Sequence, residues 1–347
     1  MSRPSTQRRS ALPLGLQRHH IVFVAYLSSI VLLGTAYSIA YGTHINNLRL
    51  SSGADSQFPS TLPGAAVAPS IQTGADGSTQ LGPLPPTIAL PPHHALNYWA
   101  NRKNIVNRIF VKKAWLWTTA AWLAQLFFLR LAPATPRLKK DEARSGQEQA
   151  TITSPVSISV LRYIVATGAW LLFANWFFGP PLAERILTAT GAVCVPGSNA
   201  GLGKVEEMYC RTRTPLSSTT HPALFASSGA AKSIRAAWRG GHDISGHTFI
   251  MVLSSLLLLE DIAPYLAALV ANSAVGRAVF GDAKVDQRAR AVVGEQKAKL
   301  AVAASVALVG LWSWMLLNTA IYFHTPQEKV SGLIVALAAW MVLPKSN

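Results

Sequence analysis

Long apolar blocks constrain the fold of this chain more than any other feature of its sequence. The blocks lie at about residues 21–41, 114–132, 157–178, 245–259, 300–323 and 327–343. Most of them approach ~20 residues, the length that an α-helix needs to cross the hydrocarbon of a bilayer. The sequence therefore predicts an all-α fold, a polytopic integral membrane protein with six transmembrane helices.

The composition agrees with a membrane protein. Hydrophobic residues make up 50% of the 347 residues and charged residues 13%, whereas ordinary globular proteins are about 25% charged. The formal net charge of +16 would also suit a nucleic-acid-binding protein. However, Lys and Arg are scattered through the segments between the blocks, which favours membrane orientation and contact with anionic headgroups. We therefore expect no nucleic-acid partner.

The basic segments orient the predicted helices, because short loops rich in Lys and Arg stay in the cytosol. Six spans then place both termini in the cytosol. The expected organisation is a cytosolic basic tail (1–20), a first transmembrane helix (21–41), a luminal Ser/Pro-rich disordered loop with a basic interfacial stretch (42–113), a five-helix membrane core (114–343) with a luminal loop (179–244), and a cytosolic tail (344–347).

Two acids follow the fourth apolar block and allow two interpretations. Either the helix ends near Glu260, or it continues to Val270 with Glu260 and Asp261 buried and a kink at Pro264. Because carboxylates in hydrocarbon are unfavourable, we expect a short span with the acids at its cytosolic boundary. A transporter would also use such acids, but no internal repeat accompanies them.

The two cysteines, Cys194 and Cys210, both lie in the predicted luminal loop. They form a disulfide if this loop faces an oxidising lumen, or they remain two free thiols. Their spacing does not match a metal-binding motif. The sequence predicts neither a metal site nor a cofactor.

Two histidines mark helix ends on the same predicted side of the membrane. His247 lies in Ser245-Gly246-His247 before the fourth block, and His324 lies in the link between the fifth and sixth blocks. A helix N-terminus binds anions, and an imidazole can protonate a leaving oxygen. In the structural alternative, Ser245 or Asp243 caps a helix and His324 belongs to an interfacial aromatic belt.

A carboxylate and two cations complete the candidate site. Glu328 follows His324 by one helical turn, and a carboxylate beside one imidazole nitrogen raises the basicity of the other. The alternative is that Glu328 pairs with Lys329 or faces water. Lys204 and Arg211 lie in the luminal loop, where such side chains can hold a phosphate.

Two strings in the sequence resemble a known family. Gly-Gly-His-Asp-Ile-Ser-Gly-His-Thr-Phe at 240–249 and Tyr-Phe-His-Thr-Pro-Gln-Glu-Lys at 322–329 resemble the two histidine blocks of the fat-storage-inducing transmembrane (FIT) family. The resemblance covers about 157–343. It implies an endoplasmic reticulum protein that acts as a fatty acyl-CoA diphosphatase, supports lipid droplet formation and contacts membrane lipids such as di- or triacylglycerol. A non-catalytic neutral-lipid-binding protein that organises droplets is the alternative.

The family in turn resembles the lipid phosphate phosphatases. That resemblance implies that His247 is a general acid, His324 a nucleophile and Glu328 an orienting carboxylate. The substrate-binding residues that it implies are Ser245, Gly246, Lys204 and Arg211. The chain departs from the phosphatase pattern at Glu328, which replaces Asp, at Asn318, which replaces Arg, and at Thr212, which replaces Pro.

Overall fold

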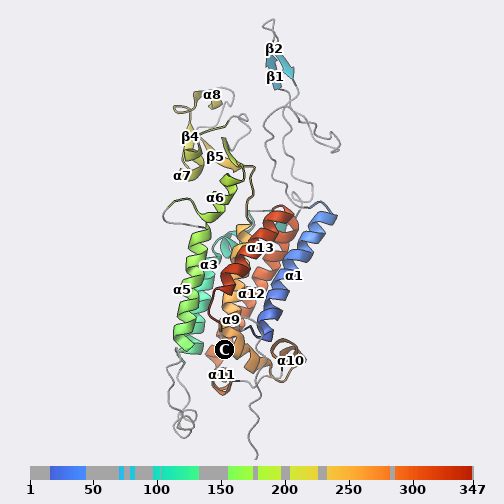
Figure 1. Cartoon of the computed structure of the whole chain (residues 1–347), viewed down its shortest axis with the longest axis vertical. Coiled ribbons are helices and arrows are strands. Elements are labelled where there is room, and N and C mark those ends of the chain that lie inside the picture. Colours follow the sequence, from blue (N-terminus) through green and yellow to red (C-terminus); the bar gives the residue numbers. More distant parts are fainter. Residues whose placement is uncertain are drawn as a thin grey trace, which may run out of the picture. The chain divides into compact units, whose positions relative to one another are not determined.

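A computed structural model describes part of the chain (Figure 1). The described residues are 16–43, 70–73, 79–82, 97–101, 103–132, 155–174, 179–196, 204–225, 233–281 and 286–345. The chain divides into two compact units. The first unit comprises Met1–His44, Arg102–Phe177 and Ser245–Asn347, and the second comprises Ile45–Asn101 and Phe178–Ile244. Of the predicted tails 1–20 and 344–347, residues 1–15 and 346–347 lie outside the described residues, and α1 begins at Arg18, inside the first of them.

The first unit is a bundle of long helices. They are α1 (Arg18–Ala40), α3 (Ala114–Gln125) with the π-helical turn η4 (Leu126–Arg130), α5 (Pro155–Ala174), α9 (Gly246–Val270), α12 (Gln296–Tyr322) and α13 (Pro326–Met341). Shorter elements are the π-helical turn η3 (Asn107–Val111) and the helices α10 (Ala274–Phe280) and α11 (Gln287–Val292). Within the described residues, α1, α5, α9 and α12 are long and apolar enough to cross a membrane. The chain is therefore a multi-pass membrane protein.

Helix α9 lies at the centre of the bundle. It contacts α1, α3, α5, α12 and α13, and Figure 1 shows these helices running alongside it. In the most apolar stretch of α9, 83% of the residues are buried, against 22% in α5. Protein therefore encloses α9, whereas α5 turns most of its apolar surface outward, as a lipid-facing helix does.

The fourth predicted span is longer than expected. Helix α9 does not end near Glu260 but runs to Val270 with Pro264 inside it, and Glu260 and Asp261 are each only 1% exposed. The prediction of a short span with the acids at its boundary is therefore wrong. It failed because it treated the acids as unpaired, whereas segments distant in sequence supply their partners.

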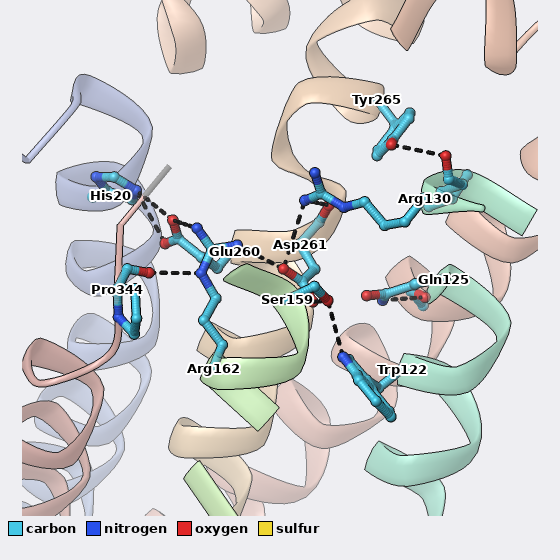
Figure 2. A network of polar contacts seen from close by, with 12 residues as sticks. His20, Trp122, Gln125, Arg130, Ser159, Arg162, Glu260, Asp261, Tyr265 and Pro344 are labelled. Carbon is cyan, nitrogen blue, oxygen red and sulfur yellow. Dashed lines mark hydrogen bonds and ion pairs between the residues drawn. The ribbon is translucent and has the colours of Figure 1, made fainter. Parts of the chain in front are cut away.

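A buried network of charged and polar side chains surrounds the two acids (Figure 2). Arg162 of α5 donates from Nη1 to Asp261 at 2.6 Å, and its Nη2 lies 3.4 Å from Glu260. The His20 ring of α1 lies 3.0 Å from a Glu260 oxygen, and the Ser159 hydroxyl donates to Asp261 at 2.5 Å. All five residues are at most 1% exposed, so each charge depends on its protein partners rather than on water.

The same network also binds the backbone of the segment after α13 and connects η4 to α9. Arg162 also donates from Nε to the Pro344 carbonyl at 2.6 Å, just after α13. Arg130, at the end of η4, donates to the Asp261 carbonyl at 3.0 Å. These contacts tie α1, α5, α9, η4 and the segment that follows α13 together at one end of the helices.

The second unit contains strands that the all-α prediction did not anticipate. Its elements are β1 (Ser70–Thr73), β2 (Thr79–Gly82), η2 (Tyr98–Ala100), α6 (Leu182–Ala189), β3 (Val193–Pro196), α7 (Glu207–Thr212), β4 (Pro215–Ser217), α8 (Pro222–Phe225) and β5 (Ser233–Arg239). One antiparallel sheet has the order β3-β5-β4, and β1 pairs with β2. Cys194 and Cys210 form a disulfide between β3 and α7, which decides between the two alternatives for these cysteines.

Most of the predicted disordered loop within 42–113 lies outside the described residues. Its described parts include the β1–β2 pair, whereas η2 and η3 follow it, with η3 in the predicted basic interfacial stretch. The two paired strands are ordered structure in a stretch where the sequence indicated none. Gly and Pro are frequent there, which masks short strand patterns in the sequence.

Breaking the buried network from one side should destabilise the bundle. Replacing Arg162 by leucine leaves Asp261 buried without its closest cation, and removing one partner of a buried ion pair typically costs about 3–5 kcal/mol. We expect a clearly lower midpoint of thermal unfolding for Arg162→Leu, measured on detergent-solubilised protein.

Arg211→Leu is the matched control. Arg211 pairs with Glu207 at 2.8 Å, but the two side chains are 45% and 59% exposed, and exposed pairs add little stability. Its unfolding midpoint should stay close to that of the wild type. An Arg162→Leu protein as stable as this control would contradict the role of the network.

Candidate active site

His247 and His324 lie side by side at one end of the bundle. Their ring centroids are 6.5 Å apart, and the ring planes are inclined by 51°. His247 belongs to the first turn of α9, and His324 lies between α12 and α13. The site is roughly 20 Å from Glu260 along α9, at 1.5 Å per residue. The two rings thus lie close together at one end of the bundle, and their placement on the luminal side of the membrane stays a prediction.

Helix α9 begins where Ser245 caps it. The Ser245 Oγ accepts from the Thr248 amide at 3.3 Å and lies 2.9 Å from the Thr248 hydroxyl. Ser245 is fully buried, and its hydroxyl caps the helix. Its role in substrate binding stays a prediction. The capping alternative is confirmed, and any contact of this block with an anion falls to backbone amides of the first turn, beginning at Gly246.

The short link between α12 and α13 first ends one helix and then caps the N-terminus of the next. His324 has a φ of +58°, the left-handed conformation that glycine favours just after a helix. The Thr325 hydroxyl accepts from the Glu328 amide at 3.4 Å, and the Glu328 carboxylate accepts from the Thr325 amide at 2.8 Å. This capping box, with Pro326 at the first helical position, starts α13 directly after the second histidine.

The carboxylate of Glu328 lies beside the imidazole of His324. Nδ1 of the ring is 3.4 Å from Oε2, the oxygen that also accepts from the Thr325 amide. The side chain of Glu328 is 3% exposed and that of His324 15%. The alternative in which Glu328 faces water is therefore wrong. A carboxylate held at Nδ1 leaves Nε2 on the far side of the ring.

Helices α9 and α13 approach each other closely at this site. The Ser245 amide donates to the Glu328 carbonyl at 3.0 Å. Gly332, one turn further along α13, faces the same point, because a Cβ there would be 2.7 Å from the Ser245 carbonyl oxygen and 3.2 Å from the Thr248 Cβ. The absence of a side chain at Gly332 thus permits the contact that joins the two histidine blocks.

The two predicted phosphate-binding cations belong to the second unit. Lys204 is exposed, and Arg211 pairs with Glu207 within α7 at 2.8 Å. Their role in binding phosphate stays a prediction. In the described part of the chain, no group of three or more His, Cys, Asp or Glu side chains is placed to hold a metal ion.

Sequence reasoning missed two residues that shape this end of the bundle. Lys329 is fully buried and donates to the Ala320 carbonyl at 2.6 Å, so it does not neutralise Glu328 by a direct pair. The only signal for Gly332 was a glycine inside an apolar block. The periodicity of a single helix does not reveal which neighbouring helix such a residue faces.

The fold and this cluster define a class of protein: a multi-pass helical membrane protein that joins two imidazoles and one carboxylate at the start of a central helix. Comparison with known sequences gives the family. The chain belongs to the Fat storage-inducing transmembrane protein (FIT) family, which matches residues 95–343. The family resemblance predicted from the two histidine blocks is therefore confirmed.

Some relatives are similar over most of the chain and others over a shorter part. Acyl-coenzyme A diphosphatase fit1 of Schizosaccharomyces pombe is 26% identical over 247 residues, covering 71% of this chain and 72% of the relative. Acyl-coenzyme A diphosphatase FITM2 of Mus musculus is 24% identical over 267 residues, covering 75% and 73%. Fat storage-inducing transmembrane protein 1 of Homo sapiens is 31% identical over 103 residues, covering 30% and 28%. No solved structure matches the chain.

Glycine should suit the position of His324 better than alanine does. A left-handed conformation costs a residue with a Cβ roughly 1–2 kcal/mol, and glycine avoids this cost. We expect the unfolding midpoint of His324→Gly in detergent to lie above that of His324→Ala. The opposite order would show that the left-handed turn is not formed in solution.

A methyl group at Gly332 should disrupt the contact between α9 and α13. The Gly332→Ala side chain would meet the Ser245 backbone, which cannot yield cheaply, so we expect a destabilisation of about 1–3 kcal/mol. Gly168→Ala is the control, because nothing in the described part of the chain lies within 4 Å of a Cβ at that helical glycine. Equal unfolding midpoints for the two variants would argue against the close approach.

Proposed function

We propose that this protein is a fatty acyl-CoA diphosphatase of the endoplasmic reticulum membrane. It cleaves the pyrophosphate of acyl-CoA to give acyl-4′-phosphopantetheine and adenosine 3′,5′-bisphosphate. The observation that carries the proposal is the 6.5 Å pairing of the His247 and His324 rings, with Glu328 beside the second ring. The names of the relatives from Schizosaccharomyces pombe and Mus musculus support the substrate class. The family name supports a role in lipid droplet formation and lipid homeostasis.

In the proposed mechanism His324 is the nucleophile. Glu328 accepts a hydrogen bond from Nδ1, so the lone pair of Nε2 attacks phosphorus. A phosphorus–nitrogen bond forms as the bridging phosphorus–oxygen bond breaks, and His247 donates its proton to the leaving phosphate oxygen. A water molecule that returns a proton to His247 then attacks the phosphohistidine and releases His324.

The substrate phosphates need positive charge around them. The amide groups of the first turn of α9, beginning at Gly246, supply part of it, and the Ser245 cap fixes where that turn begins. We assign the remainder to Lys204 and Arg211. The acyl chain enters the bundle from the surrounding lipid, and membrane lipids such as di- and triacylglycerol are its further partners.

The proposal includes a six-span topology with both termini cytosolic and the site luminal. Helix α3 with η4 and helix α13 complete the set of four longer spans. Contacts at the buried network support an even number of spans, because His20 near the start of α1 and Pro344 after α13 lie at the same end of the bundle. The Cys194–Cys210 disulfide supports an oxidising compartment for the second unit, and the endoplasmic reticulum lumen is one.

The decisive experiment is a substrate panel on the purified full-length protein. We expect hydrolysis of oleoyl-CoA and much slower hydrolysis of phosphatidate. Loss of the general acid in His247→Ala should reduce turnover about 10²–10⁴-fold, and His324→Ala should abolish it. His221→Ala, an exchange of a histidine that we place outside the site, should leave turnover unchanged.

The rival function makes the contrary prediction. A non-catalytic organiser of lipid droplets would bind triacylglycerol and support droplet formation equally well with both histidines replaced. Oleoyl-CoA turnover that survives in His247→Ala and in His324→Ala would remove the enzymatic proposal. The unfolding midpoints of all variants, measured alongside, separate a chemical loss from a misfolded protein.

A further inference from the structure

Helix α1 packs on α12, the helix that ends just before His324, although α1 lies outside the residues that the family matches. Its contact with α12 is close, because a Cβ at Gly34 would be 2.7 Å from the Ala320 Cβ. Ser38, one turn later on α1, is fully buried. Small residues four apart allow two helix backbones to approach each other in a membrane, so α1 reaches the last turn of α12.

The end of α1 turns back toward α12. Gly42 has a φ of +60°, and the Thr43 amide donates to the Ser38 carbonyl at 3.1 Å, a closing pattern in which a left-handed glycine ends a helix. This turn places the buried Thr43 hydroxyl against α12. It donates to the Ile321 carbonyl at 2.7 Å.

A lysine of α13 reaches the same turn of α12. The Lys329 ammonium is fully buried and donates to the Ala320 carbonyl at 2.6 Å and to the Ser38 hydroxyl at 3.1 Å. A buried ammonium is costly unless it is well bonded. The carbonyl end of a helix suits it, because these carbonyls lack helical partners and the helix dipole is negative there.

Two consecutive carbonyls at the end of α12 are therefore held from outside the helix. The Ala320 carbonyl accepts a hydrogen bond from Lys329 of α13, and the Ile321 carbonyl accepts one from Thr43 at the end of α1. His324 follows these two residues within one turn. A residue in a left-handed conformation keeps it only when the surrounding structure enforces it. We propose that Lys329, Ser38 and Thr43 form a clamp on the end of α12 and are positioning residues for His324. This inference rests on the proposed role of His324 as nucleophile.

The hydroxyl of Thr43 offers the sharpest test. Thr43→Val keeps the shape of the side chain and removes the hydrogen bond, whereas Thr43→Ser keeps the hydroxyl. With full-length protein and oleoyl-CoA, we expect Thr43→Val to lower kcat about tenfold at an almost unchanged KM, since small misplacements of a reacting group cost this much or more. Thr43→Ser should restore kcat. Lys329→Met should lower kcat at least as far.

Thr35→Val is the matched control on the same helix. Thr35 is 5% exposed, and its hydroxyl has no hydrogen-bond partner among the described residues, so the same exchange removes no bond seen there and should leave kcat and KM unchanged. Should Lys329→Met fail to fold, the valine and serine variants of Thr43 still decide the question.

The outcomes separate the clamp from the proposed function. Wild-type turnover that depends on His324, together with full kcat in Thr43→Val and Lys329→Met, would overturn the clamp alone. A wild type without turnover would overturn the proposed function. Nuclear magnetic resonance of isotope-labelled histidine would then test the clamp. The His324 signal should shift in Thr43→Val and stay in place in Thr35→Val. Equal His324 signals in the two variants would overturn the clamp.

Discussion

The contact between the start of α9 and the first turns of α13 is the interaction on which the candidate site depends. It includes a hydrogen bond from the Ser245 amide to the Glu328 carbonyl and a close approach that the missing side chain of Gly332 allows. Because His247 lies two residues after Ser245 and His324 four residues before Glu328, this contact brings the two rings near each other.

The bundle satisfies its polar groups in two different ways at its two ends. At one end, Arg162, Glu260 and Asp261 pair with each other in a fully buried network. At the other end, backbone groups at helix termini are capped by Thr43 and Lys329. In both places the partners come from different helices, so the polar contacts also fix which helices are neighbours. Apolar packing alone discriminates poorly among neighbours inside a bilayer.

Hydropathy and local motifs predicted much of this structure. The block at 21–41 corresponds to α1, and the two histidine blocks lie at helix ends as expected. The extent of α9 beyond Glu260 was not predictable, because the cost of a buried acid depends on a partner such as Arg162 that is remote in sequence. The strands of the second unit were missed for a related reason: each is short, and pairing and a disulfide stabilise it rather than its own pattern.

The partners in the buried network are synthesised at different times, because they are far apart in the sequence. Helix α1, with His20, leaves the ribosome first, α5 and α9 follow with their charges, and the Pro344 carbonyl that Arg162 binds is synthesised after all of them. During translation these charges enter a membrane before their full set of partners exists. The charges of α1, α5 and α9 therefore stay incompletely paired until the segment after α13 has been made, and a chain that ends before that segment lacks one of the partners of Arg162.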